Sequence, residues 1–269
     1  MIKKLLVIFC LLAVSAMPVM AELGLKVSTK YTSRYIWRGY DVGDLTGLKD
    51  GSEGIENNVG GEMISLDYGL GGGFNFNLWG YLANHVNQFE EVDLTLVYGF
   101  SLTEGIDTIL GYTHYTFPTL QLWNERNEVG RAGKRGYMYG ATADEIFIGL
   151  SLTKVFLAPT ITWYREYAQG WNDEYWNIAG GDSLDIFGGI DYSLAAGYWC
   201  SRARIAHIDV GISKTFKKAL AGFDITPAFT YIALPDTAEN PGVQPGNAQL
   251  NDQINAHEMV FSLDFSKSF

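Results

Sequence analysis

The chain ends with Met259-Val260-Phe261-Ser262-Leu263-Asp264-Phe265-Ser266-Lys267-Ser268-Phe269, and this alternating run gives the first evidence for its architecture. Successive side chains of a strand point to opposite faces, so one face holds Met259, Phe261, Leu263, Phe265 and Phe269, and the other holds Val260, Ser262, Asp264, Ser266 and Ser268. The first face is apolar and the second is mostly polar. Nothing later in the chain can cover the edge of this strand, so we expect it to pair with the first strand and close a barrel. An ordinary edge strand of a soluble sandwich is the alternative.

The first strand, predicted over residues 25–38, has two chemically different faces. One face carries Leu25, Val27, Tyr31, Tyr35 and Trp37, and the other carries Lys26, Lys30, Arg34 and Arg38. A cation on the lipid side of a membrane barrel costs about 2–4 kcal/mol at mid-depth, so in a membrane the basic face must look into the lumen. A solvated face on a soluble sheet explains this strand equally well.

The rest of the chain reads as further strands with the same period of two. The clearest places Val92, Leu94, Leu96, Tyr98, Phe100 and Leu102 opposite Asp93, Thr95, Val97, Gly99 and Ser101. The predicted strands are 25–38, 59–68, 74–82, 92–102, 106–117, 144–154, 158–167, one ending at 192, a short one at 197–201, 205–216, 223–234 and 259–269. The sequence therefore predicts an all-β protein, an up-and-down antiparallel transmembrane β-barrel of twelve strands.

Two regularities favour this barrel over a sandwich. The three long predicted loops, residues 39–57, 118–142 and 235–254, all follow odd-numbered strands, whereas even-numbered strands lead into short turns. Outer-membrane barrels have short periplasmic turns and long outer loops, and a Greek-key sandwich has no reason to obey this parity. Several even-numbered strands also end alike, as in residues 98–103, 148–153 and 263–269, which indicates that they meet the same membrane interface.

The first residues predict export. Lys3 and Lys4 precede an apolar run over residues 5–14, and small or apolar residues follow at 19–21, so we expect a signal peptide over 1–21 and a barrel domain over 22–269. The remaining chain has one cysteine, Cys200, which excludes an intramolecular disulfide there. Without Lys3 and Lys4 it has 17 basic and 30 acidic residues, an excess that argues against nucleic acid as a partner.

Several motifs resemble those of the TorF family of bacterial outer-membrane porins. The residues that carry the resemblance are Tyr31-Thr32-Ser33-Arg34-Tyr35-Ile36-Trp37-Arg38-Gly39, Leu78-Trp79-Gly80, Val260-Phe261-Ser262 and Ser266-Lys267-Ser268-Phe269. The resemblance implies a barrel in the outer membrane, surrounded by its lipid and inserted by the barrel assembly machinery. The terminal strand also resembles those of outer-membrane barrels, so Phe261, Leu263, Phe265 and Phe269 are expected to act as its assembly signal.

The predicted faces give a list of lumen-facing charges. The expected pore-lining residues are Lys26, Lys30, Arg34, Arg38, Asp67, Asp93, Glu145, Glu166, Asp209 and Asp264, and Trp79, Tyr81, Tyr112, Tyr164 and Trp199 are expected to point inward beside them. Cations on one wall and anions on the others could set up a transverse field in a water-filled pore. The alternative is that these charges pair across a narrow lumen. Lys26 or Lys30 is expected to pair with Asp264 across the closing seam.

The main functional prediction is a porin-like passive channel for small solutes, with a structural or receptor barrel of blocked lumen as the alternative. A barrel enzyme is the remote third reading. The four histidines, His85, His114, His207 and His257, are spread over separate elements, and only His207 has a carboxylate, Asp209, on its own face. No serine with nucleophile context accompanies them. We therefore predict no catalytic residue, no cofactor and no metal site.

Overall fold

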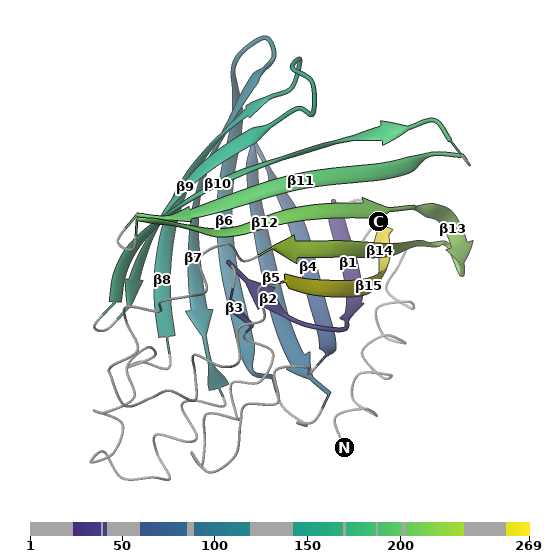
Figure 1. Ribbon diagram of the computed structural model, residues 1–269, viewed down its shortest axis with the longest axis horizontal. Helices are drawn as coiled ribbons and strands as arrows, with labels where there is room; N and C mark the ends of the chain where they lie inside the picture. Colours follow the sequence, from purple (N-terminus) through teal and green to yellow (C-terminus); the bar gives the residue numbers. More distant parts are fainter. Residues whose placement is uncertain are drawn as a thin grey trace.

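The computed structural model describes residues 24–38, 40–41, 60–84, 89–118, 142–168, 171–186, 188–200, 203–233 and 257–269 (Figure 1). These residues form strands only, apart from turns and one isolated helical residue. The strands are β1 (Leu25–Thr32), β2 (Ile36–Trp37), β3 (Tyr40–Asp41), β4 (Gly61–Gly71), β5 (Phe74–Ala83), β6 (Glu91–Thr103), β7 (Ile106–Thr116), β8 (Thr142–Leu152), β9 (Thr160–Ala168), β10 (Trp171–Leu184), β11 (Ile190–Trp199), β12 (Arg204–Ser213), β13 (Phe216–Leu220), β14 (Phe223–Ala233) and β15 (His257–Ser268). No helix among the described residues is long and apolar enough to span a membrane.

The strands close into an antiparallel barrel. Neighbours in sequence pair with each other from β4 to β12, β12 pairs with β14, and β14 pairs with β15. The ring is sealed by β1, which pairs with β15 and with β4. Because β12 and β13 both pair with β14, they act as one interrupted strand, and the ring has the twelve positions that the sequence predicts. The predicted fold class is confirmed.

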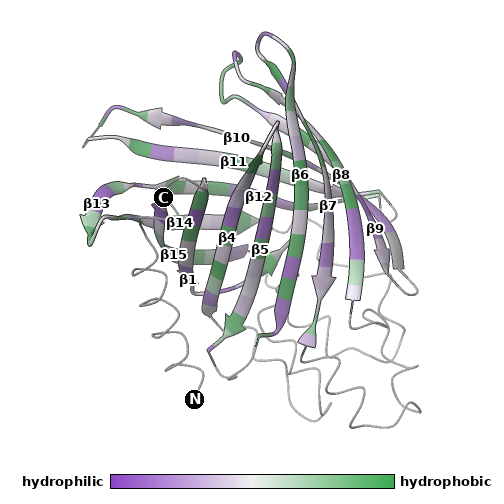
Figure 2. Cartoon of the chain, turned by 180° about the vertical axis from the view of Figure 1, so that it is seen from behind, coloured by the Kyte–Doolittle hydropathy of each residue, from purple (hydrophilic) through white to green (hydrophobic). Residues whose placement is uncertain are grey.

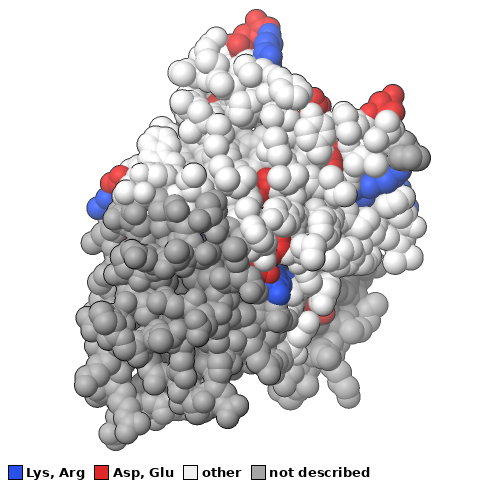
Figure 3. Space-filling view, in the orientation of Figure 1, with Lys and Arg blue, Asp and Glu red and all other residues white. Residues whose placement is uncertain are grey.

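Apolar side chains cover the outside of the barrel. The exposed residues of this outer surface include Leu94, Leu96, Ile146, Ile148, Leu150, Ile178, Leu194, Val210, Ile212, Phe229 and Phe261. Their strand neighbours at alternate positions are mostly polar or small and less exposed, and Figure 2 shows hydrophilic and hydrophobic residues alternating along β4, β5 and β6. The face drawn in Figure 3 is largely uncharged where it is described, with charges gathered mainly toward its turns. An apolar outer belt around a polar interior is the arrangement of a membrane-spanning barrel.

Connection length follows the predicted parity. The turns after β4, β6, β10 and β13 are short, and the first two use Gly72, Gly73 and Gly105 at positive φ, where a side chain would be strained. The three longest connections, 33–60, 117–141 and 234–256, follow β1, β7 and β14 and leave the opposite end of the barrel. The residues predicted to form the three long loops lie largely outside the described part of the chain, as does the predicted signal peptide.

Three predicted strands differ from the structure. The strand predicted over 25–38 stops at Thr32, and the residues after it leave the wall. Residues 190–192, predicted to end one strand, instead begin β11, which runs in full length to Trp199 and replaces the short strand predicted at 197–201. The strand before it is β10, where tight alternation is obscured by small residues at 179–181. The strand count is unchanged because both strands were predicted too late in the chain, and none was lost.

Candidate functional site: a lumen narrowed by an inward segment

After β1 the chain leaves the barrel wall and enters the lumen. We call residues 33–41 the inward segment; it includes the small β2–β3 pairing (Figure 1). At its start the Ser33 amide donates to the carbonyl of Phe261 (2.8 Å), and the Phe261 amide donates to Ser33 Oγ (2.9 Å). The segment thus starts on the β15 side, and the contacts described below take it to the opposite wall.

The first half of the inward segment is held by Arg34 and Tyr35. Arg34 makes an ion pair with Glu258 of β15, and both side chains are mostly buried. The Tyr35 ring is 8% exposed and packs on Tyr81 and Trp79 of β5, with ring centroids 4.8 and 5.6 Å away. A buried aromatic cluster with an ion pair beside it fixes the segment after its backbone contact at Ser33.

Arg38 carries the segment to the far wall. Its guanidinium carbon lies 4.4 Å from the ring centroid of Tyr164 and 4.6 Å from that of Tyr175, with the Trp199 ring at 5.8 Å. These residues belong to β9, β10 and β11. A nitrogen of the guanidinium lies 2.6 Å from Glu145 Oε2 on β8, and Trp199 Nε1 donates to the Arg38 carbonyl at 3.3 Å. We call Glu145, Tyr164, Tyr175 and Trp199 the arginine cage.

The arginine cage keeps the Arg38 guanidinium charged. The ion pair is almost fully buried, with side-chain exposures of 8% for Arg38 and 2% for Glu145. Burial, the largest single effect, lowers the pKa of Arg38, but Glu145, Tyr115 and Glu166 together outweigh it and hold the pKa above the usual value. The Arg38 backbone has a φ of 47°, a left-handed conformation that few non-glycine residues adopt. The contacts of the cage sustain this conformation.

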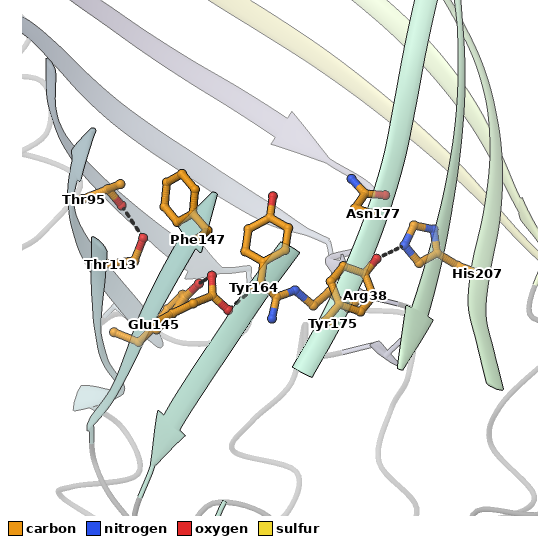
Figure 4. Close-up of a pocket in the computed structure, with 10 residues that line it drawn as sticks. Arg38, Thr95, Thr113, Glu145, Phe147, Tyr164, Tyr175, Asn177 and His207 are labelled. Carbon is orange, nitrogen blue, oxygen red and sulfur yellow. Dashed lines mark hydrogen bonds and ion pairs between the residues drawn. The ribbon is translucent and has the colours of Figure 1, made fainter. Parts of the chain in front are cut away.

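A chamber of about 370 Å³ lies beside the cage, as Figure 4 shows. In that view the Arg38 side chain reaches toward Glu145 past the rings of Tyr164 and Tyr175. The lining residues mix aromatic and hydrogen-bonding groups: Arg38, Thr95, Thr113, Tyr115, Glu145, Phe147, Tyr164, Tyr175, Asn177 and His207. Such a lining suits a small polar solute better than an apolar one.

Hydrogen bonds fix several of these side chains. Tyr115 Oη donates to Glu145 Oε1 at 2.9 Å, which orients the carboxylate that meets Arg38. Tyr175 Oη lies 2.5 Å from His207 Nε2, and His207 Nδ1 lies 2.8 Å from Asp209 Oδ1. His207 and Asp209, which the sequence placed on one face, thus form a pair that holds a ring of the cage.

The ten predicted pore-lining residues lie in five places. Glu145, Glu166 and Asp209 lie on the far wall that Arg38 reaches, and Asp93 lies on the lumen face of β6. Lys26, Lys30 and Asp264 lie on the lumen face at the seam, where Lys30 is directly opposite Asp264 without an ion pair within 4.0 Å in the described structure. Asp67 accepts a hydrogen bond from Asn77 Nδ2 at 2.7 Å on the β4–β5 wall. Arg34 and Arg38 lie on the inward segment, off the wall.

Some lumen carboxylates have oxygens that no described protein group satisfies. They are Asp93 Oδ1, Glu166 Oε2 and Asp264 Oδ1, and the amide oxygen of Asn177 joins them. A buried acceptor without a donor is costly unless water or a solute supplies one. These atoms therefore favour a lumen that is filled with water or solute over a dry core.

Sequence reasoning placed one aromatic residue wrongly and missed others. Tyr112, expected to point inward, is 44% exposed on the outer face, where its hydroxyl donates to Asp144 at 2.5 Å. The reason is register: Thr113 bonds Thr95 inside the barrel, so its neighbour must face out. Tyr175 and Tyr115 were not predicted to matter, although strict alternation from Thr113 indicates an inward position for Tyr115.

No described residues form a group of three or more histidine, cysteine or acidic side chains that could hold a metal ion. No family model and no curated protein matches the chain. The chain is similar to the KdgM porin in complex with disordered oligogalacturonate, with 6% identity, 91% of this chain and 99% of that chain covered, and a TM-score of 0.47. It is also similar to the NanC porin (12% identity, 91% and 98% covered, TM-score 0.44) and to the COG4313 outer membrane channel from Pseudomonas putida F1 (10%, 92% and 96%, 0.43). Identities and TM-scores this low assign neither a family nor a function to the chain.

Proposed function

We propose that this protein is an outer-membrane porin, a passive channel for small solutes whose lumen is narrowed by the inward segment. The observation that carries the proposal is the polar chamber of about 370 Å³ between Arg38 and the wall, inside a closed barrel with an apolar outer surface. The carboxylate and amide oxygens without protein donors support it, because a wet lumen satisfies them and a dry one does not.

The second candidate is a structural or receptor barrel whose lumen is blocked. The specific observation in its favour is that the inward segment is anchored on both sides of the lumen, by Arg34 at Glu258 and by Arg38 at Glu145. Both ion pairs neutralise charges that would otherwise face a pore. An enzyme is not proposed, because the histidine and carboxylate pairs found here orient side chains and have no nucleophile beside them.

The location and partners are part of the same proposal. The apolar outer belt requires lipid, and the predicted signal peptide over 1–21 and the TorF-like motifs point to the outer membrane of a bacterium. Insertion would then use the barrel assembly machinery, with Phe261, Leu263, Phe265 and Phe269 as the signal. Membership of the TorF family belongs to this proposal too.

Single-channel recording in planar bilayers tests the proposal. Purified, heat-modifiable barrel is expected to produce discrete conductance steps in potassium chloride. Replacing Arg34 and Arg38 by Glu adds negative charge on the inward segment and is expected to shift ion selectivity toward cations. Folded protein that inserts without any conductance would contradict the channel and favour the blocked barrel.

A further inference from the structure

The arginine cage has the composition of a binding site for an organic cation. Tyr164 and Tyr175 bring their rings within 4.6 Å of the guanidinium carbon, and Glu145 supplies a carboxylate that Tyr115 holds in place. Aromatic faces around a cation, with one carboxylate for its charge, are the groups by which proteins recognise guanidinium and ammonium ligands. Here the guest is a side chain of the protein itself.

The cage is also open to the lumen. Arg38 and three of the four cage residues line the chamber, so a solute in the chamber is in contact with the cage. Glu166, which faces Arg38 from β9, has a buried oxygen without a donor among the described residues. A second cation entering the chamber would therefore meet carboxylate acceptors and aromatic faces.

We propose that the cage formed by Glu145, Tyr164, Tyr175 and Trp199 binds solutes with a guanidinium or ammonium group, and that Arg38 occupies it as an internal ligand that such solutes displace. Displacement frees the far end of the inward segment, so the solute that binds also widens its own path. The inference that binding widens the path of the solute rests on the proposed channel function, whereas the inference that the cage binds the solute does not.

Calorimetric titration of folded protein in detergent with guanidinium chloride tests the binding directly. A tethered side chain competes at an effective concentration of about 1 mM or more, so removing it in Arg38→Ala is expected to tighten guanidinium binding by about tenfold. Urea, which has a similar planar shape without charge, is expected not to bind, and sodium chloride corrects for ionic strength. Adding Glu145→Gln to Arg38→Ala is expected to abolish the binding.

Lys30→Ala is the matched control, because it removes a lumen cation at the seam, far from the cage in the strand order. It is expected to bind guanidinium as weakly as the parent protein. If Arg38→Ala fails to fold, Arg38→Met keeps the aliphatic part of the side chain and empties the charge site in the same way. Equal guanidinium binding by the Arg38 variant and the Lys30 control, or binding of urea equal to that of guanidinium, would overturn the proposal that the cage binds cations.

Planar bilayers then separate the two proposals. Guanidinium is expected to raise the conductance of the parent protein, because displacement of Arg38 frees the inward segment, and to change the conductance of Arg38→Ala much less, because that end of the segment is already free. Binding in the calorimeter without conductance in any variant would reject the channel and leave the cage standing. Conductance of the parent protein that guanidinium and sodium affect alike would reject the displacement of Arg38 and leave the channel.

Discussion

Single side chains decide how the lumen is partitioned. Arg38 is one residue in a segment of nine, yet it contacts four strands of the opposite wall. Its carboxylate partner, Glu145, is held in turn by Tyr115. Substitutions of Arg38 or Glu145 are therefore expected to change the stability of the barrel more than substitutions in the exposed ion pairs elsewhere in it.

Replacing Glu145 by Gln tests the buried ion pair. Arg38 would keep its charge without a paired carboxylate, and breaking a buried pair costs about 3–5 kcal/mol. We expect that loss in the free energy of unfolding, measured by urea titration in detergent micelles. Glu104→Gln is the control: its ion pair with Lys154 is exposed, and we expect no measurable change. Equal effects of the two substitutions would show that the cage does not hold Arg38 as described.

Gly111 tests close packing on the wall. A Cβ at this position would overlap the ring of Phe147, its direct cross-strand partner. Gly111→Ala is expected to lower the free energy of unfolding by about 1–3 kcal/mol, because the ring must leave its position over the glycine. Gly99→Ala is the control on the adjacent strand, where the nearest atom is 3.9 Å away. If the free energies of unfolding of Gly111→Ala and Gly99→Ala differ by less than the error of the urea titration, the close packing of Phe147 on Gly111 is contradicted.

At the scale of elements, the inward segment is the part that strand patterns cannot predict. Alternation continues from β1 through Arg34 and Arg38, so the sequence predicts a longer strand and places both cations on its polar face. The structure ends the strand at Thr32, whose side-chain hydroxyl bonds the carbonyl of Arg34 at 2.5 Å. The cage that takes Arg38 comes from residues 145–199, and no local pattern links it to residue 38.

Releasing the inward segment is expected to widen the channel. The double substitution Arg34→Ala and Arg38→Ala removes the ion pairs at Glu258 and Glu145, which hold the segment on both sides. We expect a larger single-channel conductance than that of the parent protein. Lys217→Ala, which breaks an exposed ion pair with Asp224 near the β13–β14 turn, should leave the conductance unchanged. An unaltered conductance in the double variant would show that the segment does not limit the path.

At the scale of the whole molecule, the barrel was predictable because its signal is repeated in every strand. The period of two arises because each strand faces lipid outside and the lumen inside. The parity of loop lengths arises because the two ends of the barrel lie on different sides of the membrane, so both patterns recur from β4 to β15. The exact path of β10 and β11 was not predictable, because Gly180, Gly181 and Ala195 weaken the alternation there. The lumen charges were predicted by face, but the way that they pair was not.

Neighbouring residues on β11 test the assignment of faces for the whole barrel. Leu194 is 42% exposed on the outer surface, and Ala195 lies on the inner face opposite Asp209. Leu194→Lys is expected to destabilise the barrel in lipid by about 2–4 kcal/mol, and Ala195→Lys should cost much less because the cation meets Asp209. Unfolding by urea in phospholipid vesicles measures both. A larger loss of stability for Ala195→Lys than for Leu194→Lys would show that the outer and inner faces are assigned the wrong way round.

The closing seam gives a prediction about assembly. The Phe269 amide donates to the carbonyl of Leu25 at 2.9 Å, so the last residue joins the start of the first strand. Phe269→Ser is expected to reduce the amount of heat-modifiable barrel in the outer membrane several-fold, whereas Ser268→Ala should not. Equal amounts of both variants, measured by immunoblotting of membrane fractions, would contradict a role for the terminal aromatic residue.

The path of the inward segment also sets the order in which this protein can mature. Residues 33–41 emerge early in synthesis, but the rings that receive Arg38 belong to strands made more than a hundred residues later. Until β8 to β11 have joined the wall, Arg38 has no cage to bind. The inward segment can therefore be fixed across the lumen only after the second half of the barrel has formed.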